Sequence, residues 1–298
     1  MATLAADTGD DPSPATARPS RRGLALLLPW PVGWMAFFYL TPLATLLVYA
    51  FWSARGTGID HSPTLENLDT ITSRPLYRTI FLRTVVMATA VTLTDLALAL
   101  PLAYWLAKRV KRHRELLLVL VIFPLWSSYL VRIVAWKNLL GGSGIVNSFL
   151  EWTGLVDQPV TFFLYSRWSV YLALTHVWLP FMILPLFSVL DRLPDNLLEA
   201  SADLGASGFA TFRRVVLPQA KPGLLAGALS TFSLTMGDYI APTLLGGPGD
   251  QLIGKIIADQ FGTADNWPLG AALVLPVLLA VSALLVVANR AGATERTS

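Results

Sequence analysis

Six apolar runs, each about as long as a membrane-spanning helix, constrain this chain more than any other feature of its sequence. A helix needs about 20 mainly apolar residues to cross the hydrocarbon core of a bilayer. The expected spans cover about residues 24–52, 80–107, 115–140, 168–190, 223–245 and 268–289. The composition agrees, because 54% of the residues are hydrophobic and 14% are charged, a balance that excludes a sizeable soluble domain. We predict an all-α, polytopic membrane protein with about six transmembrane helices.

The first 22 residues differ in composition from the rest of the chain. They are rich in Ala, Thr, Ser, Pro and Asp without periodicity, so they cannot bury enough apolar surface to fold. We predict a disordered cytoplasmic tail over residues 1–22, a transmembrane domain over residues 23–290 and a short cytoplasmic tail over residues 291–298. Arg21 and Arg22 would also fit a cleaved twin-arginine signal, but the apolar run that follows is far longer than the core of such a signal.

The distribution of Lys and Arg predicts the orientation of the spans. Six of the seven residues in the run 108–114 are Lys, Arg or His, and basic residues beside a membrane span resist translocation. With six spans, 14 of the 22 Lys and Arg residues fall on the same side of the membrane as this run. Both termini are therefore predicted to be cytoplasmic, together with the polar segment 194–222 between the fourth and fifth spans.

The segment 194–222 has the composition of a short helical bracket. Glu199 and Asp203 stand four residues apart, so both carboxylates project from one side of a helical turn. Gly205 is expected to end this helix in a left-handed conformation, which glycine adopts at little cost. Ser207 is a suitable cap for a second helical turn.

The second half of the bracket is more apolar and ends at prolines. Phe209, Phe212 and Val216 would lie on the second helical turn. Pro218 and Pro222 are expected to stop the bracket just before the chain enters the next span.

The bracket also resembles a known family. It reads Glu199-Ala200-Ser201, three residues, Gly205, nine residues, and then Val215-Val216-Leu217-Pro218. This pattern is similar to the EAA loop of ABC-importer permeases, from which it departs by a Ser for an Ala and a Val for an Ile. In that family the loop is a coupling helix that seats in a groove of a cytoplasmic ATPase. The resemblance implies an ATPase-coupling role for Glu199, Ala200, Ser201, Asp203, Gly205, Phe209, Leu217 and Pro218; the alternative is an ordinary interfacial helix.

Two carboxylates lie inside predicted spans. Asp95 falls in the middle of the second and Asp238 in the fifth, where an ionised carboxylate costs several kcal/mol unless it is paired or wet. Tyr239 and Pro242 indicate that the fifth helix is broken near a cavity, and a carboxylate beside aromatic rings favours an ammonium ligand. The alternatives are that Asp95 pairs with Arg132 and that Asp238 caps a helix fragment.

Two further stretches sharpen the resemblance. Residues 123–147 and 266–272 are similar to the corresponding parts of spermidine/putrescine-type permeases, a subfamily that also includes transporters of other solutes. The resemblance implies a type I ABC-importer permease fold and a polyamine as the cargo. The implied substrate pathway contains Asp238, Tyr239, Asp95, Trp126, Tyr129, Arg132 and Trp136, although the aromatic members are also suited to packing.

The family implies partners rather than resident cofactors. We expect a cytoplasmic ABC ATPase dimer that binds ATP and Mg²⁺, a second homologous permease, a periplasmic or extracellular solute-binding protein and the lipid of a bacterial inner membrane. No cofactor, metal or nucleic acid is expected on this chain, since its three histidines lie far apart and it has no cysteine.

Other classes of function account for less of the sequence. A self-sufficient secondary transporter could use Asp95 and Asp238 as ion relays, but it would leave the bracket unexplained, and a membrane scaffold would have no need of either acid. Enzyme chemistry is not expected. Residues 249–256 have P-loop spacing up to Lys255, but Ile256 stands where a P-loop needs Ser or Thr.

Overall fold

The computed structural model describes residues 29–56 and 58–293 and divides the chain into two units, residues 1–46 and 47–298. The first unit holds most of α2 (Pro29–Tyr49), which corresponds to the first predicted span. The predicted tail over residues 1–22 lies outside the described residues, and so do residues 294–298. Residues 291–293 of the second predicted tail belong to the last helix, α14 (Trp267–Ala293).

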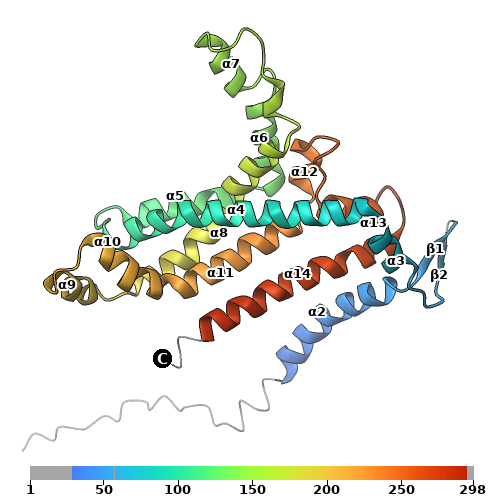
Figure 1. Cartoon of the computed structure of the whole chain (residues 1–298), viewed down its shortest axis with the longest axis horizontal. Helices are drawn as coiled ribbons and strands as arrows, with labels where there is room; N and C mark the ends of the chain where they lie inside the picture. The colour runs from blue at the N-terminus through green and yellow to red at the C-terminus, as the bar shows by residue number, and fades with distance from the viewer. Residues whose placement is uncertain (1–28, 57, 294–298) are drawn as a thin grey trace, which may run out of the picture. The chain divides into compact units, whose positions relative to one another are not determined.

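Three helices form the centre of the second unit. They are α4 (Pro75–Lys108), α8 (Arg167–Asp191) and α11 (Leu217–Met236), and each packs against the other two (Figure 1). Their contact surfaces are rich in small residues, which let helices in a membrane approach closely. Pro180 and Pro185 lie inside α8 without ending it, as predicted.

The third predicted span is broken, which corrects the expectation of one helix over residues 115–140. It consists of α5 (Arg114–Trp126) and α6 (Tyr129–Leu140), and the direction of the chain changes by 92° between them. Pro124 has no N–H to extend the helix, and its carbonyl accepts hydrogen bonds from both the amide and the hydroxyl of Ser127. The next segment, which lies between the third and fourth predicted spans, contains α7 (Ile145–Trp152) and the 3₁₀ turn η1 (Thr161–Phe163).

The number of long apolar helices is in line with about six spans. Four helices of the described chain, α2, α4, α8 and α14, are long and apolar enough to cross a membrane, and the bent pair would provide a fifth crossing. The remaining predicted span corresponds to α11, a 20-residue helix packed against α4 and α8.

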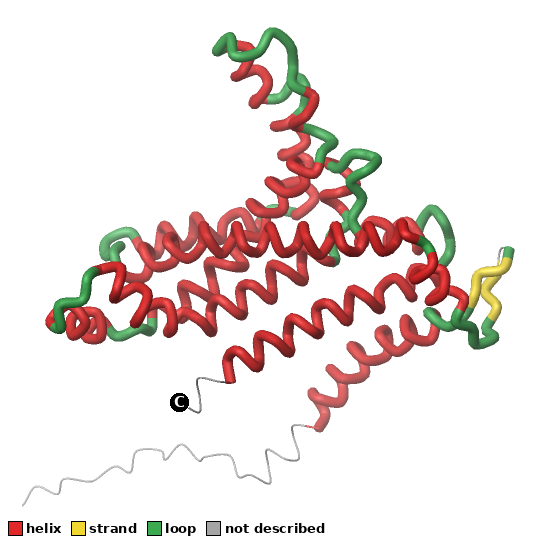
Figure 2. The backbone as a smooth tube through the Cα atoms, in the orientation of Figure 1, coloured by secondary structure: helices red, strands yellow, loops and turns green. Residues whose placement is uncertain are grey.

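The segment between the first two spans is more ordered than predicted. It contains a small antiparallel hairpin of β1 (Ser53–Arg55) and β2 (Gly58–Asp60), yellow in Figure 2, followed by α3 (Glu66–Ser73). The buried side chain of Asn67 donates to the carbonyls of Ala50 and Trp52. This amide therefore holds α3 to the chain just before the hairpin, a contact between distant residues that leaves no local signal in the sequence.

The fifth predicted span is interrupted, as the sequence indicates. α11 ends at Met236, and the short helix α12 (Ile240–Leu245) begins after the break. The segment between the fifth and sixth predicted spans contains the helix α13 (Ile253–Phe261). Its isoleucines pack against Tyr77 of α4 and Leu273 of α14; their helical spacing is the signal that sequence reasoning missed.

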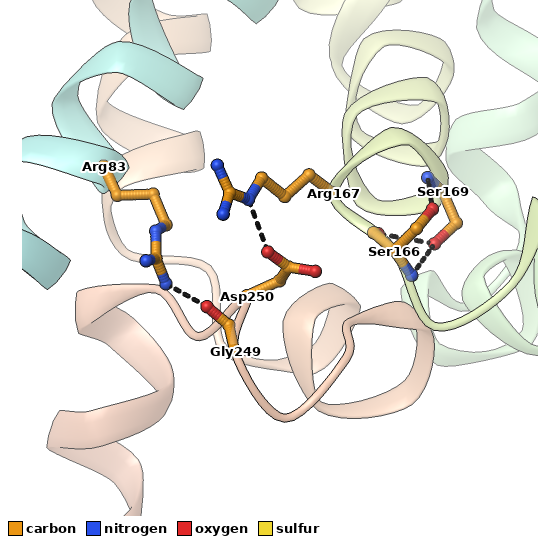
Figure 3. A network of polar contacts seen from close by, with 6 residues as sticks. All are labelled: Arg83, Ser166, Arg167, Ser169, Gly249 and Asp250. Atoms are coloured by element: carbon orange, nitrogen blue, oxygen red, sulfur yellow. Dashed lines mark hydrogen bonds and ion pairs between the residues drawn. The ribbon is translucent and has the colours of Figure 1, made fainter. Parts of the chain in front are cut away.

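The loop between α12 and α13 is held by arginines from two other helices. Figure 3 shows Arg83 of α4 donating to the carbonyl of Gly249 and Arg167 of α8 pairing with Asp250, with 2.5 Å between Nε and Oδ1. Ser169, in the first turn of α8, also donates to the carbonyl of Leu245 at 2.8 Å. These contacts fix the loop between α12 and α13.

Candidate functional site

The bracket between α8 and α11 has the predicted helix, turn and cap. Its first helix is α9 (Asp195–Asp203), and Gly205 has a φ of +76°, the left-handed conformation that ends it. The hydroxyl of Ser207 accepts from the amide of Ala210 and so caps α10 (Gly208–Thr211). The hydroxyls of Ser201 and Thr211 lie 2.8 Å apart, which joins the two helices of the bracket.

The prolines do not stop the bracket, which corrects that expectation. α10 continues through the π-helical segment η2 (Phe212–Val216) directly into α11, so the helical run extends from residue 208 to residue 236. The amide of Leu217 bonds to the carbonyl of Phe212, five residues earlier. This wider turn lies just before Pro218, where the next backbone N–H is missing, and Pro222 follows inside α11.

The bracket presents both apolar and acidic side chains at its surface. Leu204 is 87% exposed and Phe209 is 73% exposed, although both are large apolar residues. The acidic side chains of Glu199 and Asp203 belong to exposed residues of α9, and Ala200, Gly205 and Pro218 are exposed as well. Ser201 and Leu217 are partly buried. An exposed apolar patch with a polar surround is a surface suited to a protein partner.

Basic residues fix the start of the bracket to the spans, a role that sequence reasoning missed. Lys108, the last residue of α4, donates to the carbonyl of Leu193 and to Asp195, with 2.8 Å between Nζ and Oδ1. Its side chain is only 7% exposed. The hydrogen bond and charge of Lys108 hold the pKa of Asp195 below its usual value. The sequence signal for these contacts is the basic run 108–114, which by itself indicates only the orientation of the spans.

A second ion pair lies beside the first. Arg114, at the start of α5, pairs with Asp191 at the end of α8 and lies over the ring of Phe187, 4.9 Å from its centroid. The ends of α4, α5 and α8 and the start of α9 are therefore joined on one side of the bundle.

Asp238 lies at the break in the fifth span and is buried. One of its carboxylate oxygens accepts from the hydroxyl of Tyr129, and the other accepts from the amide of Ala241 at 2.9 Å. Asp238 therefore does cap the helix fragment α12. The ring of Tyr129 stacks on Trp178, with 5.2 Å between centroids, and the guanidinium of Arg132 lies 5.8 Å from the same ring.

Three other residues of the predicted pathway have different surroundings. Tyr239 is 50% exposed and Trp126 is 75% exposed. Trp136 donates from Nε1 to Nδ1 of His176 at 3.2 Å. The aromatic residue that contacts Asp238 is thus Tyr129 rather than its chain neighbour Tyr239. Trp178 was not predicted as part of this group. It lies inside α8, two residues before Pro180, and a polar aromatic residue beside a proline within a span is the signal that could have identified it.

Asp95 is fully buried in α4, and neither carboxylate oxygen has a hydrogen-bond partner among the described residues. The alternative in which Asp95 pairs with a basic residue such as Arg132 is therefore not what the described residues show. Arg132 is carried by α6, where its guanidinium faces Tyr129 and the carbonyl of Val177, whereas Asp95 belongs to the part of α4 that packs against α8 and α11.

Comparison with known proteins decides the family. Residues 99–293 match the family described as binding-protein-dependent transport system inner membrane component. The chain belongs to this family. The permease is 39% identical over 287 residues to the inner membrane ABC transporter permease protein YdcU of Escherichia coli (strain K12), covering 92% of this chain and 91% of YdcU. It is 36% identical over 261 residues to the spermidine/putrescine transport system permease protein PotB of the same organism, covering 87% of this chain and 94% of PotB.

A solved structure supports the same fold. A chain from a bacterial ABC transporter involved in the import of the acidic polysaccharide alginate matches the permease with a TM-score of 0.68 and 18% identity, covering 92% of this chain and 94% of that chain. The predicted type I ABC-importer permease fold is confirmed. The permease is a membrane-embedded transport subunit of an ABC importer and not an enzyme, and ATPase activity belongs to separate chains.

The orientation that the basic residues predict for the spans can be tested directly. A reporter that is active only in the cytoplasm should work when fused after Arg114 or Lys221, because both positions follow basic segments that resist translocation. The same reporter should be inactive after Gly154 or Asp259. Activity of the four fusions in intact cells is the measurement, and a cytoplasmic signal at either of the last two positions would contradict the six-span orientation with cytoplasmic termini.

Proposed function

We propose that the permease carries a polyamine such as spermidine or putrescine into the cell, driven by ATP hydrolysis on partner chains. The observation that carries this proposal is the buried carboxylate of Asp238 beside the stacked rings of Tyr129 and Trp178. The relative PotB, named as a spermidine/putrescine permease, supports the same substrate class.

The chemistry of the Asp238 group suits an ammonium ion. A polyamine must shed water from its ammonium groups inside a narrow path, and a carboxylate replaces that hydration most directly. Aromatic faces add cation–π attraction, which is stronger in a site shielded from water. In the described conformation the hydroxyl of Tyr129 occupies one carboxylate oxygen, so an arriving ammonium group would take the place of that hydroxyl.

A permease for an anionic solute is the alternative, and one contact favours it. The guanidinium of Arg132 lies over the same tyrosine ring and could bind a carboxylate or phosphate. The solved neighbour belongs to an importer of an acidic polysaccharide. For such a solute, the negative charge of Asp238 would be repulsive, so the two candidates predict opposite effects when this charge is removed.

Asp238→Asn should therefore lower spermidine uptake by the assembled transporter. The amide oxygen can still accept from the amide of Ala241, so the cap on α12 is kept while the charge is lost. A hydrogen bond to a charged group contributes about 1.5–3 kcal/mol, which corresponds to about a tenfold to hundredfold loss of affinity. The measurement is the uptake of radiolabelled spermidine as a function of its concentration, and Asp238→Glu should retain part of the activity.

Asp259→Asn is the matched control. It removes the same charge from α13, where Asp259 pairs with Lys255 and is partly exposed, and it should leave uptake near the wild-type rate. Unchanged transport in Asp238→Asn would leave this carboxylate with only a capping role. A wild-type transporter that does not take up spermidine at all would refute the polyamine assignment.

We also propose that the bracket is the surface that docks on the ATPase. The docking surface would contain Glu199, Ala200, Ser201, Asp203, Gly205, Phe209, Leu217 and Pro218. The exposure of Leu204 and Phe209 supports this, as does the match of the bracket to the EAA pattern. The complete transporter would contain an ATPase dimer, a second homologous permease and an external solute-binding protein.

A further inference from the structure

Five buried residues of the central three helices carry polar atoms without a hydrogen-bond partner in the described chain. They are Thr92, Asp95, Thr175, Trp178 and Thr231. Asp95 and Thr231 are fully buried, and the other three are almost so. Two of these residues belong to α4, two to α8 and one to α11, the three helices that pack against one another.

Contacts on either side place Asp95 along α8. Thr94 precedes Asp95 in the chain, and its hydroxyl lies 2.5 Å from the hydroxyl of Tyr171 on α8. One turn later, Ala99 belongs to the same buried cluster as Met182. Asp95 therefore lies at the level of the α8 segment between Tyr171 and Met182.

The other polar residues lie at the same level. Thr175 and Trp178 are the two members of the set on that segment of α8. On α11, Gly227 lies so close to Met182 that an added Cβ would be 3.1 Å from its Cα, and Thr231 follows one helical turn later. We call this group, Thr92, Asp95, Thr175, Trp178 and Thr231, the inner polar cluster.

Such a cluster destabilises the fold in which it is found. A buried hydroxyl or indole N–H without a partner loses its hydrogen bonds to water, and a carboxyl group can remain only as the neutral acid or beside a cation. Apolar residues of similar volume would pack here at lower free energy. Groups that weaken a fold in this way are typical of sites needed for activity.

The composition of the inner polar cluster matches an ammonium group. An ammonium group offers N–H donors and no acceptor, while the carboxylate and three hydroxyls offer oxygen acceptors and the indole of Trp178 offers an aromatic face. Trp178 also links the cluster to Asp238, because its ring stacks on Tyr129, whose hydroxyl donates to Asp238. The stacked rings of Tyr129 and Trp178 thus lead from Asp238 to the inner polar cluster, of which Trp178 is a member.

We propose that the inner polar cluster is a second ammonium-binding site, closed in this conformation, with Asp95 as its anion. The proposal rests on the proposed transport of polyamines and deepens it. The cation leaves Asp238, passes the stacked rings of Tyr129 and Trp178, and binds Asp95 when α4, α8 and α11 separate during the transport cycle. The ring of Trp178 borders both sites.

The experiment combines a transport readout with a stability readout on the complete transporter. Spermidine uptake and the melting temperature are measured for wild type, Asp95→Asn and Asp95→Leu in the same lipid and detergent. We expect both variants to lose about tenfold or more of the uptake, because the anion of the site is gone. We also expect the melting temperature to stay constant or rise, most for Asp95→Leu, because an unpartnered polar group has been removed.

Thr89→Val is the matched control on α4. Thr89 is exposed, and its hydroxyl bonds within its own helix, so uptake and melting temperature should both stay close to wild type. A clear fall in the melting temperature of Asp95→Leu would show that the carboxyl group stabilises the fold, and it would overturn the inner site. Wild-type uptake in Asp95→Asn would overturn the inner site alone, whereas a wild-type transporter without spermidine uptake would refute the polyamine assignment as well.

Discussion

Gly205→Val is expected to lower solute uptake by about tenfold or more while the permease still inserts into the membrane. Gly205 ends α9 with a φ of +76°, and a β-branched residue in this conformation is strained by about 1–3 kcal/mol. The added side chain itself would meet open space, so the effect acts through the backbone. The strain is relieved by rotating α9 relative to α10, which distorts the surface proposed to dock on the ATPase.

Uptake by the assembled transporter and co-purification of the ATPase are the two measurements. Gly205→Asn is the matched control, because asparagine tolerates the left-handed region and should retain most of the activity. Glu199→Lys tests the same surface without touching the backbone, since it reverses a charge on an exposed position of α9. Normal uptake together with normal ATPase co-purification in both Gly205→Val and Glu199→Lys would remove the docking proposal.

Features set by local chemistry could be read from the sequence. The positions of the long helices follow from apolar length, and the turn at Gly205 and the cap at Ser207 follow from the conformations and hydrogen bonds of single residues. The break near Asp238 could be predicted because Tyr239 and Pro242 follow this acid inside an apolar run. Each of these features depends on a few consecutive residues.

Two errors arose where proline acts differently in different surroundings. Pro124 was placed inside a continuous span, yet Ser127 completes a break there by bonding twice to its carbonyl. Pro218 was expected to end a helix, but the helix continues through it. The π turn just before Pro218 widens the helix where a residue without a backbone N–H follows. A proline indicates that a backbone bond is lost; its neighbours decide whether the helix bends, widens or ends.

The remaining features depend on residues far apart in the chain. A pair between Asp95 and Arg132 was one alternative for the buried acid, but α6 directs this arginine toward Tyr129. Trp178 of α8 stacks on Tyr129, the first residue of α6 after the bend, and so joins these two helices. Composition and periodicity identify which residues are polar inside the membrane, and only tertiary packing determines which of them meet.

Lys108→Met should uncouple transport from ATP hydrolysis, so that uptake falls while hydrolysis continues. The ammonium group of Lys108 holds the end of α4 to the carbonyl of Leu193 and to Asp195, the first residue of α9. Methionine keeps the apolar stem of the lysine but removes this connection, so movement of α9 would no longer be passed directly to α4. Because Lys108 is the residue that joins the end of α4 to the start of α9 through these two hydrogen bonds, we expect uptake to fall by about tenfold at an ATPase rate close to wild type.

Rescue and pH dependence distinguish this role from a general loss of stability. Lys108→Arg should restore part of the uptake, and Arg112→Met, which removes a charge from an exposed position of the same basic run, should behave like wild type. Lys108 lowers the pKa of Asp195, so the ion pair is complete at neutral pH and is lost only as the pH falls through that lowered pKa. Uptake per ATP hydrolysed is the decisive measurement: if Lys108→Met and Arg112→Met give the same ratio as wild type, α4 and α9 are not coupled through Lys108, and the pair with Asp195 only orders the end of the helix.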